Sequence, residues 1–122
     1  MKNLLLTVIA ALALTVGTVE AAAKKPMSVV HVVTIKWKAG TTPEQIAGAL
    51  QGAQTVANSY KGITRIWTKA LKVQGSGYTH AIVMEFKDEQ ALKDYTDSPA
   101  QKEWYKIYLP IREESTTHDI TN

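Results

Sequence analysis

Two side chains that together suit proton transfer, a histidine and an aspartate, lie far apart in the sequence. His31 stands near the start of an alternating segment, and Asp119 lies close to the C-terminus. A carboxylate beside an imidazole fixes the tautomer of the ring and stabilises its protonated form, as proton transfer requires. His31 and Asp119 are therefore candidate catalytic residues. The alternative is a structural hydrogen bond that holds the last strand in place.

The sequence lacks the motifs of several other common kinds of site. The 122 residues include no cysteine, and neither a Walker nor a Rossmann glycine motif is present. His31 and His80 are expected several residues apart along neighbouring strands, so they are not expected to share a metal ion. The 14 Lys and Arg residues against 11 Asp and Glu give a net charge of +3 without a basic stripe. The sequence predicts no metal, no cofactor and no nucleic-acid partner.

Residues 1–23 have the pattern of an export signal. Lys2 gives a positive start, an apolar run follows from Leu4 to Val16, and small residues suit cleavage after Ala21 or Ala23. The expected product is a periplasmic or secreted protein with a flexible start over 24–28, a domain over 29–121 and no membrane contact after cleavage. A retained membrane anchor is the alternative.

The remaining chain predicts the elements that must position these side chains. Alternation and β-branched residues predict strands over Ser28–Lys38, Ile63–Lys72, Tyr78–Phe86 and Ser115–Thr121. Capping residues predict helices from Pro43 to about Asn58, from Asp88 to about Tyr95 and from Ser98 to about Tyr108. This βαββαβ order predicts an α+β, ferredoxin-like fold whose four-stranded antiparallel sheet has the spatial order fourth, first, third, second. The helices then cover one face.

The two strands expected at the centre of the sheet carry apolar side chains on both faces. One face holds Val33, Ile35, Ile82 and Met84, and the other holds Val30, Val32, Ala81 and Val83. A half-solvated sheet is usually polar on its open face, and leaving these side chains in water forfeits on the order of 1 kcal/mol each. We therefore expect a homodimer through the open sheet face. A wet, weakly apolar face is the alternative.

The sequence resembles the stress-responsive A/B barrel (Dabb) family. The similar segments are HVVTIKWK from His31 with Gly40, GYTHAIVMEF from Gly77, ALKDY from Ala91, and Pro99-Ala100, within a region from about Val29 to Thr121. The resemblance implies a ferredoxin-like monomer that dimerises into an α/β barrel. Plant members include polyketide cyclases that need no cofactor.

The resemblance also implies site residues. His31, His80 and Tyr95 match family positions in the first strand, the third strand and the second helix, and Asp119 matches an acid near the chain end. The cyclases carry a general acid/base histidine where this chain has Gln101, and Gln does not exchange a proton near neutral pH.

The break between the two C-terminal helical segments, around Tyr95 and Gln101, is expected to form the rim of a pocket between sheet and helices. We predict a small hydrophobic or aromatic ligand there, with His80, Gln101, Ile35 and Ile82 as binding residues. The alternative is a cofactor-free polyketide cyclase or lyase that uses His31, Asp119 and Tyr95 for proton transfer. Two further hypotheses are a haem-degrading or quinol-type monooxygenase, by fold analogy alone, and an interaction protein without a ligand.

Overall fold

The computed structural model describes residue 23 and residues 26–122. The elements follow the order β1 (Val29–Trp37), α1 (Pro43–Ser59), β2 (Ile63–Trp67), β3 (His80–Phe86), α2 (Glu89–Tyr95), α3 (Pro99–Tyr108) and β4 (Arg112–Ile120). The predicted export signal lies outside the described residues apart from Ala23, so it stays a prediction. No helix in the described part is long and apolar enough to cross a membrane.

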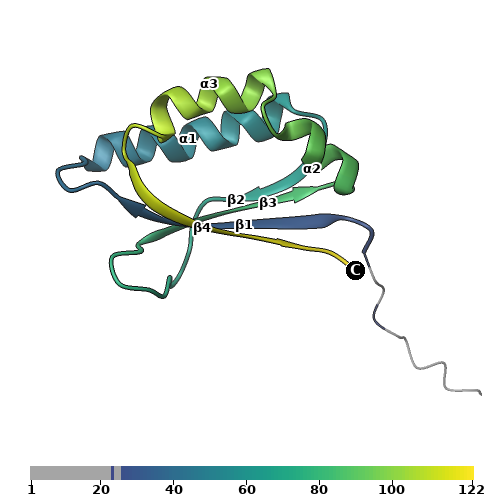
Figure 1. The fold of residues 1–122 in the computed structure, drawn as a ribbon, viewed down its shortest axis with the longest axis horizontal. Coiled ribbons are helices and arrows are strands. Elements are labelled where there is room, and N and C mark those ends of the chain that lie inside the picture. Colours follow the sequence, from purple (N-terminus) through teal and green to yellow (C-terminus); the bar gives the residue numbers. More distant parts are fainter. Residues whose placement is uncertain (1–22, 24–25) are drawn as a thin grey trace, which may run out of the picture.

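The sheet is antiparallel, with the strand order β2-β3-β1-β4. Helices α1 and α3 lie side by side over one face, and no helix or strand of residues 26–122 covers the other face (Figure 1). This confirms the predicted ferredoxin-like topology and the predicted strand order. In the register, His31 lies opposite Met84 on β3 and opposite Asp119 on β4, which brings the first and last strands together.

Alternation along the strands places the core under the helices. Ile35, Ile82 and Met84 are fully buried there, and Ala49 and Ala53 of α1 pack above them. The small residues of α1 serve close packing between helices, because the indole Nε1 of Trp104 donates a 2.8 Å hydrogen bond to the Ala49 carbonyl.

Three strand boundaries differ from the prediction by two residues or more. β2 ends at Trp67 rather than Lys72, and β3 begins at His80 rather than Tyr78. The segment between them forms a loop in which Gly75 and Gly77 adopt positive φ angles and the Tyr78 amide bonds to the Gly75 carbonyl. The Thr79 amide still donates to the Ile35 carbonyl of β1, whereas residues 68–72 are paired with no neighbouring strand within 26–122.

β4 begins at Arg112 rather than Ser115. The charged run Arg112-Glu113-Glu114 resembled a loop, but β4 is an edge strand, and charged side chains are common on such edges because they face solvent.

Candidate functional site

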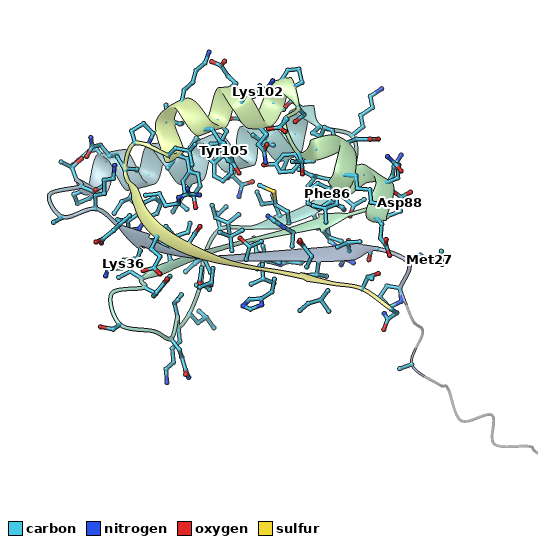
Figure 2. All side chains as sticks on the ribbon, in the orientation of Figure 1. Met27, Lys36, Phe86, Asp88, Lys102 and Tyr105 are labelled. Carbon is cyan, nitrogen blue, oxygen red and sulfur yellow. The ribbon has the colours of Figure 1, made fainter. Side chains whose placement is uncertain are left out.

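A cleft lies between the helix-covered face of β1 and β4 and the undersides of α2 and α3. It encloses about 440 Å³. We call it the α3–β4 cleft. Its helical wall is mostly aromatic, with Tyr95, Trp104, Tyr105 and Tyr108. Its strand wall is mostly polar, with His31, Arg112, Ser115, Thr117 and Asp119. In Figure 2, Tyr105 projects from α3 toward the sheet, whereas Lys102 lies on the outer side of the helix.

The predicted pairing of His31 with Asp119 is present in this cleft. The Nδ1 atom of His31 lies 2.5 Å from Oδ1 of Asp119, and the two side chains are 18% and 44% exposed. The His31 ring also meets the edge of Phe86 at 6.0 Å between centroids. Because Asp119 occupies Nδ1, the other ring nitrogen, Nε2, is free to accept a proton from a ligand.

Tyr95 lies at the end of α2 and packs against Phe86 and Tyr60, with ring centroids 5.2 and 5.6 Å apart. Burial raises the pKa of Tyr95 well above its ordinary value. A phenol with a raised pKa stays protonated at neutral pH, so Tyr95 can donate a hydrogen bond or act as a weak acid, but it is not poised to act as a base.

Gln101 also lines the cleft, but its amide is engaged by the protein. Its Oε1 accepts from the Asp97 amide at 2.7 Å, and its Nε2 donates to the Tyr105 hydroxyl at 3.2 Å. Asp97 has a φ of 63°, a left-handed conformation that most residues avoid. Gln101 thus holds the turn between α2 and α3 and orients Tyr105.

Three predicted ligand-binding residues lie outside the cleft lining. Ile35 and Ile82 are buried in the core, with at most 1% exposure. The Nδ1 of His80 accepts a 2.9 Å hydrogen bond from the indole of Trp37, near the other end of β1. The register places His80 opposite Ile35, four residues along β1 from His31. Ile35 and Ile82, predicted as binding residues, are part of the hydrophobic core.

Sequence reasoning missed Arg112, Ser115 and Thr117. The last two share a face with Asp119 by simple alternation along β4, so that signal was available. Arg112 was not expected to lie in a strand. Its guanidinium lies 5.5 Å from the centroid of the Tyr108 ring. No group of three His, Asp or Glu side chains that could hold a metal ion occurs among the described residues.

Comparisons with known proteins agree with this architecture. The model of the stress responsive A/B barrel domain family matches residues 29–122. A stress-response A/B barrel domain-containing protein of Arabidopsis thaliana, HS1, is 30% identical over 90 residues, covering 71% of this chain and 81% of the relative.

Among solved structures, the hydroxynitrile lyase from Passiflora edulis has a TM-score of 0.71 at 19% identity, covering 80% of this chain and 94% of that one. A dimeric ferredoxin-like protein of unknown function from Thermobifida fusca has a TM-score of 0.68 at 16% identity, covering 84% and 98%. At these identities the likeness shows the fold.

Proposed function

The chain belongs to the stress responsive A/B barrel domain family, and we propose that it binds one small aromatic molecule in the α3–β4 cleft of each subunit. This proposal is based on the size and lining of the cleft. Its volume of about 440 Å³ lies at the lower end of the range for small-molecule sites, roughly 300–1,000 Å³. Aromatic rings on one wall suit stacking with a flat ligand, and hydroxyls and charged groups on the other suit oxygen substituents.

The proposed assembly is a homodimer of exported subunits. Two solved neighbours are described as dimeric proteins with this fold, from Bacteroides fragilis and Thermobifida fusca. The uncovered face of the sheet carries Val30, Val32, Ala81 and Val83, together with Trp67 and Ile120, which are 46% and 58% exposed. An apolar face of this kind suits burial against a second copy. Export rests only on the sequence pattern of residues 1–23.

Binding is tested by an NMR screen of aromatic fragments. The proposal expects backbone amide shifts to concentrate on cleft residues of α3 and β4. In Thr117→Trp, a large ring placed in the cleft is expected to remove those shifts. Glu113→Trp is the control, because Glu113 lies on the same strand, is exposed and does not line the cleft. Shifts that concentrate elsewhere, or that survive Thr117→Trp unchanged, would contradict the proposal.

A second candidate function is a cofactor-free lyase or cyclase. The specific observation that favours it is the His31–Asp119 pair beside Tyr95 in the cleft. His31 would remove a proton from the bound substrate through Nε2, and the Asp119 carboxylate would stabilise the imidazolium that forms. Tyr95 would donate a hydrogen bond to a substrate oxygen. One solved neighbour at fold level is a hydroxynitrile lyase.

This second candidate is tested by turnover of carbonyl and cyanohydrin substrates. His31→Asn should lower kcat by at least about 100-fold if His31 is the base. His118→Asn is the control, since His118 lies on β4 with its side chain on the opposite face from Asp119. Equal turnover by wild type and His31→Asn would remove the candidate and leave the binding proposal standing.

A further inference from the structure

An arginine lies at the end of the α3–β4 cleft away from His31, and no carboxylate of the described residues pairs with its charge. Arg112 is half-buried and makes no ion pair with any carboxylate in that part of the chain. Its guanidinium instead lies over the Tyr108 ring. A guanidinium that stacks on a ring by its face keeps its N–H donors at the edge free for an anion.

One of the hydroxyl groups around Arg112 lacks a hydrogen-bond partner within residues 26–122. The Tyr108 hydroxyl is buried and has no hydrogen-bond partner among the described residues. Burial raises the pKa of Tyr108 and of Tyr105, and the charge of Arg112 opposes both shifts. Ser115 lines the same part of the cleft from β4. One cation and three hydroxyl groups therefore surround a place where a carboxylate would have ready hydrogen-bond donors.

The opposite end of the cleft does not compete for an anion. There Asp119 is paired with His31, and its negative charge disfavours a second carboxylate. The register separates the two ends, since His31 lies opposite Asp119 whereas Arg112 lies opposite Trp37, six residues further along β1. The cleft is thus electrostatically polar along its length, positive at Arg112 and acidic at Asp119.

We propose that Arg112 anchors a carboxylate, so that the ligand class of the cleft is a small aromatic carboxylic acid oriented with its acid group toward Arg112. This rests on the function proposed above. A bidentate contact between a guanidinium and a carboxylate fixes orientation as well as affinity. The phenyl or hydroxyphenyl part then lies among the aromatic rings of α3, with any remaining oxygen toward His31.

The test compares two probes of nearly equal size, 3,5-dihydroxybenzoate and 3,5-dihydroxybenzamide, by calorimetry and by amide shifts at neutral pH. The wild-type protein should bind the acid at least about 10-fold more tightly than the amide, with less preference at high salt. Arg112→Gln should reduce that preference to less than about 2-fold. Arg112→Lys should retain part of it, since lysine keeps the positive charge but lacks the paired N–H donors of the guanidinium. Thermal unfolding of both variants checks that they fold.

Lys102→Gln is the matched control, because Lys102 is an exposed cation on the outer side of α3 and does not line the cleft. It should leave the preference for the acid unchanged. If Lys102→Gln removed the preference, or if both probes bound the cleft equally and Arg112→Gln changed nothing, the anion site at Arg112 would be excluded while the binding function stood. If neither probe shifted any cleft amide, the proposed function itself would fail, and the anion site with it.

Discussion

His31 and His80 are held in opposite tautomers by their hydrogen-bond partners. A carboxylate only accepts, so the Nδ1 of His31 carries the proton it donates to Asp119. An indole only donates, so the Nδ1 of His80 is the unprotonated nitrogen that accepts from Trp37. Asp119 therefore determines which ring nitrogen of His31 is available to a ligand in the proposed site.

This difference gives a direct prediction. Long-range ¹⁵N NMR above pH 8 should show the Nδ1–H form for His31 and the Nε2–H form for His80. Asp119→Asn should shift His31 toward a mixture of tautomers and leave His80 unchanged, because the Trp37 contact is intact. An Nε2–H form of His31 in the wild type would contradict the role assigned to Asp119.

Glu85 is expected to make the free energy of unfolding depend on pH. Hydrogen bonds from Arg65, and from Thr64 and Ser28, lower the pKa of the Glu85 carboxyl from 4.5 to about 2. A lowered folded-state pKa contributes stability above the unfolded-state value, and this contribution is lost as the pH falls from about 4.5 toward 2. We expect Glu85→Gln to lower the free energy of unfolding at pH 7 by about 1 kcal/mol, a reduced figure because Arg65 is largely exposed.

The measurement is urea unfolding of wild type and Glu85→Gln between pH 2 and 7. The two free energies of unfolding should converge as the pH falls through this range. Parallel curves across the range would show that the Glu85 cluster does not stabilise the folded state through its charge.

At single positions, sequence reasoning succeeded where a residue's partner follows from strand register. His31 and Asp119 were placed together because the first and last strands of this topology are neighbours. It failed where side-chain direction depends on packing: Gln101 turned inward to hold the Asp97 amide, and the His80 ring is held by Trp37. No sequence pattern reports such contacts.

Helix α1 packs on α3 at a position where only glycine fits. A Cβ added at Gly52 would lie 2.7 Å from Cδ1 of Trp104 and 2.8 Å from Cδ1 of Ile107. The indole is fixed by its bond to Ala49, so it does not move aside easily. Gly48, one turn earlier on α1, has nothing within 4 Å of such an atom.

The two glycines form a matched pair for a stability measurement. Gly52→Ala should lower the free energy of unfolding by about 1–3 kcal/mol through overpacking. Gly48→Ala should raise it by roughly 0.5–1 kcal/mol, because alanine is the better helix former. Denaturant unfolding of both variants checks this. Equal effects at the two positions would mean that α1 and α3 pack less closely than described.

Helices were predicted more accurately than strands for a physical reason. Caps are local: the Thr42 side chain accepts from the Gln45 amide, and Ser98 does the same for Gln101, as their spacing indicated. Strand ends are not local, because a strand continues only while a neighbouring strand pairs with it. The pairing of β2 with β3 ends at Trp67, opposite Val83, although the residues that follow fit an extended conformation.

The uncovered sheet face is the surface through which we expect two subunits to form a dimer in solution. Val83 lies opposite Val32 and Trp67 near the middle of that face. Val83→Glu would bury a charge in the proposed dimer, so we expect a dimer for wild type and a monomer for Val83→Glu by sedimentation velocity at micromolar concentration. Ile107→Glu is the control and should remain dimeric, because Ile107 is 49% exposed on α3, on the helix-covered side of the sheet. A monomeric, folded wild type would contradict the proposed assembly.

The account depends most on one claim, that the α3–β4 cleft holds a small molecule. Native mass spectrometry of the protein purified from its own host tests it directly, with Thr117→Trp prepared in the same way. The account predicts a dimer that carries one small-molecule adduct per subunit in wild type and none in Thr117→Trp. A Thr117→Trp protein that keeps the same adduct would show that the ligand binds elsewhere and would contradict the claim.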